Sequence, residues 1–232
     1  MEGVFIMNEF PENNNEINSQ TQTPTKTFDL KKEVFEWFYT ILIAFLIAFI
    51  IKTFLFDIVK VDGSSMYPTL HHNDRLIITK LGYKPEQKDI IILDSNYKRK
   101  EQHYAIREQN GESFNVVTKF FDSFSLPQDL KPRYYVKRII ALPGQTVNIV
   151  DGKVFVDDKL LEEEYYDGIT PKTDPSVTYP ITVEEDHVFV MGDNRNNSTD
   201  SRASSLGQVP FDAILGKAQI RIWPFSSIGF TE

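Results

Sequence analysis

An uncharged apolar run near the N-terminus constrains the fold of this chain more than any other feature of its sequence. The run Trp37–Ile51 reads WFYTILIAFLIAFII, and Thr53–Phe56 extend it beyond Lys52. A helix that spans a bilayer needs roughly 20 apolar residues, and the long side chain of Lys52 can reach the headgroups. The run therefore predicts a transmembrane anchor over residues 34–56, and its first three residues form an aromatic belt.

Two other interpretations of this run compete with an uncleaved anchor. A cleavable signal peptide needs small residues just before its cleavage site, and the segment Lys52–Asp57 (KTFLFD) offers none. A helix buried in a protein core is the other alternative, which the apolar character of the run on all sides disfavours. The basic residues slightly favour a cytoplasmic N-terminus, because three precede the run and two follow it: Lys26, Lys31, Lys32, Lys52 and Lys60.

Length, charge and composition exclude several classes of protein. The 232 residues suit one or two domains, and residues 1–33, rich in Asn, Glu, Thr and Pro, predict a disordered tail. A net charge of −8 argues against a nucleic-acid partner, and the short basic run Lys98–Lys100 is interpreted as a solvated loop. The absence of cysteine excludes disulfides, Cys-based zinc sites and a thiol nucleophile.

The hydrophobic pattern changes to period two after the apolar run. Short β-branched segments bounded by turn residues predict strands at 75–79, 89–93, 146–150, 153–156 and 187–191. Asp151-Gly152 predicts a tight hairpin, since a type I′ turn needs positive φ at both central positions, and Asp157-Asp158 predicts the next turn. No GxGxxG, Walker or βαβ pattern occurs. Residues 57–232 are therefore expected to form a mainly β, antiparallel, barrel-like domain.

Three dense motifs carry the residues that could perform chemistry: GSSMYPTL at 63–70, YYVKRIIALPG at 134–144 and GDNRNNSTDSR at 192–202. Amide hydrolysis needs a nucleophile, a base and donors for the oxyanion. A lysine can be the base only if burial lowers its pKa from about 10.4. Lys137 lies in an apolar stretch and shares a face with Tyr135 and Ile139. Lysine among β-branched residues is commonly an edge-strand residue as well, so the pattern alone leaves both interpretations open.

Together the three motifs resemble the type I (bacterial leader) signal peptidases, which are membrane-anchored Ser–Lys proteases. The resemblance covers roughly residues 35–95 and 130–228. It implies that Ser65, directly before Met66-x-Pro68-Thr69, is the nucleophile and that Lys137 is the general base. Ser64 is the neighbouring alternative, which the spacing to Met66 disfavours. Residues 95–133, polar first and apolar from Phe114 to Phe124, are an insertion of unknown role, because this stretch is shorter in most relatives.

The resemblance also implies supporting residues. Ser198 would orient the lysine amine, and Asp200 would pair with Arg138 and Arg202. The Ser65 backbone N–H would bind the oxyanion; the second donor stays open, because Gly63 has no side chain to offer. Asp193 and Asn194 are interpreted either as turn formers or as direct catalytic participants. Residues expected to line the substrate pockets are Leu70, Tyr135 and Val136.

The resulting functional expectation is a single-span signal peptidase of the bacterial cell membrane. It would cut exported preproteins after a small-x-small motif on the outer face, without metal or cofactor, with the substrate bound as an added strand. One rival is a soluble Ser–Lys protease such as a self-cleaving repressor, which the anchor and acidic charge disfavour. The other is a catalytically inactive, membrane-tethered β-domain that binds peptides, which the intact Ser65, Lys137 and Ser198 disfavour.

Overall fold

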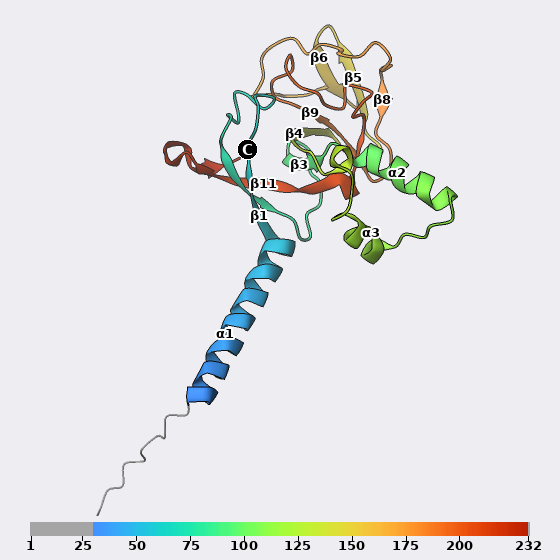
Figure 1. Cartoon of the computed structure of the whole chain (residues 1–232). Coiled ribbons are helices and arrows are strands. Elements are labelled where there is room, and N and C mark those ends of the chain that lie inside the picture. The colour runs from blue at the N-terminus through green and yellow to red at the C-terminus, as the bar shows by residue number, and fades with distance from the viewer. Residues whose placement is uncertain (1–29, 232) are drawn as a thin grey trace, which may run out of the picture. The chain divides into compact units, whose positions relative to one another are not determined.

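The structure, a computed structural model, describes residues 30–231 and divides into two compact units, one ending at Ala44 and the other beginning at Phe45. Helix α1 (Leu30–Ile50) carries most of the apolar run and continues into a short π-helix, η1 (Ile51–Leu55) (Figure 1). Within residues 30–231, no helix combines the length and hydropathy that a membrane crossing needs. Most of the predicted disordered tail lies outside the described residues, and its last residues, 30–33, belong to α1.

The unit that begins at Phe45 contains two antiparallel sheets. The larger has the strand order β1-β2-β11-β3-β4-β9-β10, and β12 pairs with β11. Its strands are β1 (Phe56–Lys60), β2 (Arg75–Thr79), β3 (Ile90–Asp94), β4 (Tyr134–Ala141), β9 (His187–Met191), β10 (Val209–Pro210), β11 (Ile214–Trp223) and β12 (Gly229–Phe230). The smaller sheet has the order β7-β6-β5-β8, formed by β7 (Lys159–Leu160), β6 (Lys153–Val156), β5 (Thr146–Val150) and β8 (Ile181–Thr182).

The period-two segments and both predicted turns are confirmed. All five predicted strands occur, and β4 forms at the lysine motif. Asp151 and Gly152 have φ of 49° and 75°, and Asp157 and Asp158 have φ of 50° and 62°. Positive φ at two consecutive positions favours residues such as Asp and Gly, whose small side chains tolerate the left-handed region.

The expected barrel-like closure is wrong for the described strands, which form two open sheets. The strands at the ends of the larger sheet's order, β1 and β10, are not paired with each other. β10 has only two residues, and its second is Pro210. Because proline has no N–H to donate, it ends the ladder at an edge.

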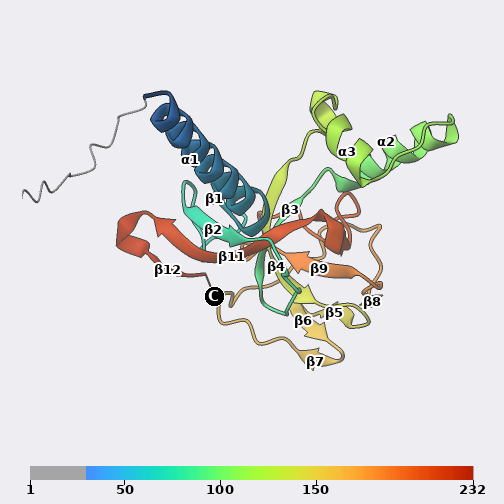
Figure 2. The same ribbon diagram turned by 90° about the horizontal axis from the view of Figure 1, so that it is seen from below.

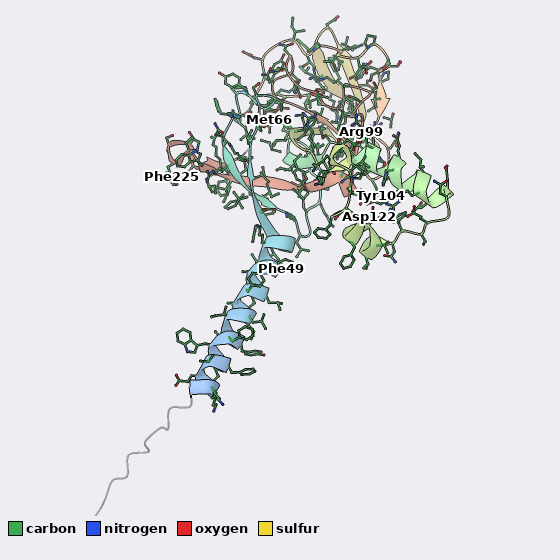
Figure 3. The ribbon with its side chains drawn as sticks, in the orientation of Figure 1. Phe49, Met66, Arg99, Tyr104, Asp122 and Phe225 are labelled. Carbon is green, nitrogen blue, oxygen red and sulfur yellow. The ribbon has the colours of Figure 1, made fainter. Side chains whose placement is uncertain are left out.

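A buried cluster of apolar side chains supports the loop between β1 and β2. Met66 and Leu70 from that loop are 1% and 0% exposed, and they pack with side chains of β2, β3 and β11. Figure 3 shows Met66 in the interior of this unit. Two further clusters lie along β3, β4 and β9 and between β4, β9 and the smaller sheet. The loop that contains Ser65 is thus held by its own buried side chains.

The segment 95–133 folds as two helices between β3 and β4, α2 (Tyr97–Gln109) and α3 (Val116–Asp122), followed by the 3₁₀ turn η2 (Gln128–Leu130) (Figure 2). Asn115 and Thr118 form a reciprocal capping box that begins α3. The base of the insertion is fixed to the domain, because the buried Tyr97 hydroxyl donates to the Leu206 carbonyl at 2.8 Å. Two more 3₁₀ turns, η3 (Phe211–Ala213) and η4 (Phe225–Ser227), flank β11.

Candidate active site

The loop 61–74 between β1 and β2 presents the predicted nucleophile. Its ends are joined by backbone hydrogen bonds from Val61 N–H to the Asp74 carbonyl (2.8 Å) and from Asn73 N–H to the Val61 carbonyl (2.9 Å). Ser64 is exposed and Ser65 half-buried. The Ser65 N–H has no acceptor within residues 30–231. A backbone donor left open beside a nucleophilic hydroxyl can bind the oxyanion that forms on the substrate carbonyl oxygen when that hydroxyl attacks.

The structure brings Lys137 to Ser65 across 72 positions of sequence. Lys137 lies on β4 opposite Ile91 of β3 and is 2% exposed. Its Nζ lies 2.8 Å from Ser65 Oγ and donates to the Val136 carbonyl at 3.0 Å. The Tyr135 ring, on the same face of the strand, is centred 5.0 Å from Nζ. The predicted dyad is therefore within hydrogen-bonding distance.

Burial gives Lys137 the protonation behaviour that a base needs. Removal of the ammonium from water lowers the pKa of Lys137 from 10.5 to about 8. The carboxylates of Asp200 and Asp193 oppose this shift, and the nearby guanidinium of Arg202 adds to it. The neutral amine, which can accept a proton, is thus accessible slightly above neutral pH.

The GDNRNNSTDSR motif holds the nucleophile loop by a set of polar contacts that the sequence did not reveal. Asn194 donates its backbone N–H to the Ser65 carbonyl at 3.0 Å and its side-chain amide to the Ser64 carbonyl at 3.1 Å. The Asn197 amide donates to Ser64 Oγ at 2.9 Å. Asn194 therefore does more than shape a turn. A pairing between segments some 130 residues apart leaves no mark on local pattern, so only the fold could disclose it.

The buried arginines pair differently from the expectation. Of the two arginines, Asp200 pairs only with Arg202, with Arg202 Nη2 and Asp200 Oδ2 2.8 Å apart and both side chains 0% exposed. Arg138 instead makes a two-pronged contact with Asp193, at 2.9 Å and 2.8 Å. Successive side chains point to opposite faces of a strand, so Arg138 faces away from its neighbour Lys137. Asp193 also accepts a 2.6 Å hydrogen bond from the Thr69 hydroxyl, which ties this ion pair to the nucleophile loop.

Ser198 lies beside the backbone of the nucleophile. A Cβ on Gly192 would come within 2.3 Å of Ser198 Oγ and 2.4 Å of the Ser65 carbonyl oxygen. These distances are too short for any side chain, so the close approach requires glycine at position 192. Ser198 Oγ is buried and has no hydrogen-bond partner in the described part of the chain. The expected hydrogen bond from Ser198 to the lysine amine does not form in this structure.

A cleft of about 360 Å³ opens next to the dyad. Two of the three expected pocket residues, Tyr135 and Val136, line it. Leu70 does not line the cleft, because its side chain is fully buried beneath the loop. The local sequence pattern of a Pro-containing turn could not predict this burial. The walls come from the end of β1, the nucleophile loop, the start of β4 and the third motif: residues 59–66, Ile92, 134–137, Asn197 and Thr199.

The histidines take part in other contacts. His72 Nδ1 accepts from the Gly63 N–H at 3.2 Å, and the His71 ring packs edge-on against Tyr67 with centroids 5.2 Å apart. His187 Nδ1 lies 2.7 Å from the Glu185 carbonyl. In the described residues, His, Cys, Asp and Glu do not gather in any group of three or more that could hold a metal. The side-chain group in contact with Ser65 Oγ is the amine of Lys137.

Comparison with known proteins identifies the family of the chain. The chain matches the family described as signal peptidase, peptidase S26, over residues 34–223. It is 35% identical to a probable signal peptidase I-2 of Synechocystis sp., over 82% of this chain and 73% of the relative. It is 34% identical to signal peptidase I T of Bacillus subtilis, over 94% of this chain and 98% of the relative.

A crystal structure of a signal peptidase I from Enterococcus faecalis is also similar, with 23% identity and a TM-score of 0.37, over 59% of this chain and 98% of that chain. The length and identity of the sequence matches establish the family. The chain belongs to the signal peptidase family, peptidase S26, and is a serine endopeptidase of the kind that removes signal peptides.

Proposed function

We propose that this protein removes N-terminal signal peptides from exported preproteins, cutting after a small-x-small motif, with Ser65 as nucleophile and Lys137 as general base. The observation that carries the proposal is the 2.8 Å approach of Lys137 Nζ to Ser65 Oγ at a lysine that is 2% exposed. A serine hydroxyl needs a base to become nucleophilic, and this amine is the titratable group in contact with it.

Each step of the reaction uses a group already in place. Neutral Lys137 takes the Ser65 proton while Oγ attacks the scissile carbonyl, and the Ser65 N–H stabilises the oxyanion. The resulting ammonium gives its proton to the leaving amine, which leaves an acyl ester on Ser65. Lys137, neutral again, then takes a proton from a water that attacks the ester, and the same cycle returns the free hydroxyl.

The cleft supports an extended substrate. Its walls are the end of β1 on one side and the start of β4 on the other, so a peptide laid between them would run beside both strands and exchange backbone hydrogen bonds. Tyr135 and Val136 are half-buried on the β4 wall. Side chains of this bulk on the wall of the cleft would favour small residues on the substrate, as the small-x-small motif requires.

We further propose that residues 34–56 anchor the chain in the bacterial cell membrane, with the tail 1–33 cytoplasmic and the peptidase domain 57–232 on the outer face. The support is the uncharged run Trp37–Ile51 and its aromatic first residues. An anchor would hold the cleft beside preproteins in the same bilayer and raise their effective concentration without any new contact.

Cleavage of a purified preprotein by the full chain in detergent or lipid tests the assignment of the dyad. Ser65→Ala removes the attacking oxygen and should abolish cleavage. Lys137→Arg keeps the positive charge but cannot accept a proton, since guanidinium stays protonated, so it should abolish cleavage as well. Ser64→Ala is the matched control and should retain substantial activity.

The pattern of activities distinguishes the possible errors. An inactive Ser64→Ala together with an active Ser65→Ala would move the nucleophile by one position. An active Lys137→Arg would exclude lysine as the base. Circular dichroism and the unfolding midpoint of each variant show that loss of activity is not loss of fold.

A further inference from the structure

We propose that Thr69 is a positioning residue for the reaction proposed above. Its hydroxyl links the nucleophile loop to the buried ion pair of Arg138 and Asp193, and this link orients the Ser65 hydroxyl toward the Lys137 amine. The inference rests on the proposed function and deepens it, because it assigns a part in the reaction to a side chain outside the set that lines the cleft.

The Thr69 hydroxyl makes a short hydrogen bond to a charged acceptor. It donates to Asp193 Oδ2 at 2.6 Å, a distance typical of a hydroxyl bound to an ionised carboxylate. Thr69 is half-buried, and Asp193 is 1% exposed. Because exclusion of water strengthens a hydrogen bond, this contact restrains the loop more than the same contact would at the surface.

The acceptor is itself fixed to the strand that carries the base. Arg138 donates to Asp193 through Nε at 2.9 Å and through Nη2 at 2.8 Å, and its Nη1 donates to the Lys88 carbonyl at 2.9 Å. Arg138 directly follows Lys137 on β4. A planar guanidinium bound at three nitrogens has a fixed orientation, so the carboxylate that receives Thr69 has a fixed place relative to the base.

A compact turn joins Thr69 to the nucleophile. The Leu70 N–H donates to the Met66 carbonyl at 2.9 Å, and both of these side chains are buried. Ser65 and Thr69 flank this one turn of chain. A movement of the loop at Thr69 therefore changes the direction in which the Ser65 hydroxyl points.

Thr69 supplies a second directional attachment for the loop. The first is at Ser65 itself, whose carbonyl accepts the Asn194 N–H at 3.0 Å. Packing of Met66 and Leu70 holds the loop as well, but hydrophobic contact is non-directional. One directional contact lets the loop pivot, whereas a second contact four residues away opposes the pivot. A nucleophile displaced by about 1 Å can lose about a hundredfold in rate, so this restraint bears on catalysis.

Replacement of Thr69 by valine removes this contact and leaves the neighbouring ones in place. Valine is branched like threonine but has no hydroxyl to donate. The backbone carbonyl of residue 69 still accepts from Arg221 Nη1 at 3.2 Å, and Asp193 keeps both hydrogen bonds from Arg138. We therefore expect Thr69→Val to fold and to bind substrate as the parent chain does.

Single-turnover cleavage of a purified preprotein by excess full chain in detergent tests the proposal. Thr69→Val should lower the maximal rate about tenfold to a hundredfold, with the half-saturating enzyme concentration unchanged. The charges around Lys137 do not change, so the pH of half-maximal activity should also stay the same. Thr69→Ser keeps the hydroxyl and should restore most of the rate.

Thr231→Val is the matched control. The Thr231 hydroxyl is buried and donates to the Ala218 carbonyl at 2.9 Å, so this variant loses a comparable hydrogen bond elsewhere in the same sheet. It should lower the unfolding midpoint without lowering the maximal rate.

Amide hydrogen exchange provides a measurement that does not depend on activity. In Thr69→Val, the Leu70 N–H should exchange about tenfold faster than in the parent chain, because a charge-assisted hydrogen bond no longer opposes local opening of the loop. The same amide should keep its parent rate in Thr231→Val.

Four results would overturn the role of Thr69. They are a parent-like maximal rate in Thr69→Val, an equal loss of rate in Thr231→Val, no recovery in Thr69→Ser, and a raised half-saturating concentration with the maximal rate unchanged. The last would mean that Thr69 acts in substrate binding. A parent chain that cleaves no preprotein, although Thr69→Val still exchanges faster at Leu70, would refute the proposed function and leave the link between loop and ion pair standing.

Discussion

A rise in pH from 7 to 9 should increase kcat/KM about tenfold and then bring it to a plateau, because the active form of Lys137 is the neutral amine. With a pKa of about 8, about a tenth of the amine is neutral at pH 7 and about nine tenths at pH 9. The direction follows from burial, which destabilises the ammonium and so lowers the pKa.

Two alternative bases predict different profiles. A solvated lysine that keeps a pKa of 10.5 would give about a hundredfold rise between pH 7 and 9, with no plateau. A histidine base with a pKa near 6.5 would give a rise of less than about twofold over the same range. The three profiles are far enough apart for steady-state kinetics to separate them.

The assay uses a short peptide without groups that titrate between pH 6.5 and 10, at concentrations well below KM, so that the rate reports kcat/KM of the free enzyme. The unfolding midpoint is measured at each pH to confirm that the fold persists. A flat profile above pH 7, or a rise that continues to pH 10 without levelling, would refute the assignment of a buried Lys137 as the base.

Three further predictions concern the groups around the dyad. Gly192→Ala should destabilise the fold by about 1–3 kcal/mol in denaturant unfolding and reduce cleavage, because the new Cβ meets Ser198 Oγ and the Ser65 carbonyl oxygen within 2.4 Å; Gly229→Ala, with open space around it, should change neither. Ser198→Ala should leave the unfolding midpoint unchanged, since the buried Oγ has no partner in the described residues, and reduce cleavage less than either dyad substitution; a large drop in the midpoint would contradict this. Asp200→Asn should cost about 3–5 kcal/mol because it leaves a fully buried guanidinium without its counter-charge; a change below about 1 kcal/mol would show that the ion pair does not hold the fold.

Local chemistry explains the elements that the sequence predicted correctly. The strand at 75–79 could be predicted from a short window of sequence because its buried residues alternate with more exposed ones. The strand at 187–191 is buried on both faces, and its Val and Phe residues together with the turn residues around it predicted it. The turn at Asp151-Gly152 could be predicted because few residue types adopt positive φ. The dyad could be predicted for another reason, because each of its two residues lies in a dense motif that resembles the corresponding motif of a known family.

The tertiary structure decided everything that depends on segments far apart in the chain. Which strands form the edges of the larger sheet was settled by the fold: β1 and β10 end its strand order, and Pro210 of β10 has no N–H to donate to a further strand. The partner of Arg138 was settled by strand alternation, which sends its side chain to Asp193. The burial that lowers the pKa of Lys137 also belongs to the fold, since desolvation depends on atoms contributed by several strands. The sequence by itself determined which groups could react, and only the packing of the sheet determined that Lys137 Nζ would lie 2.8 Å from Ser65 Oγ.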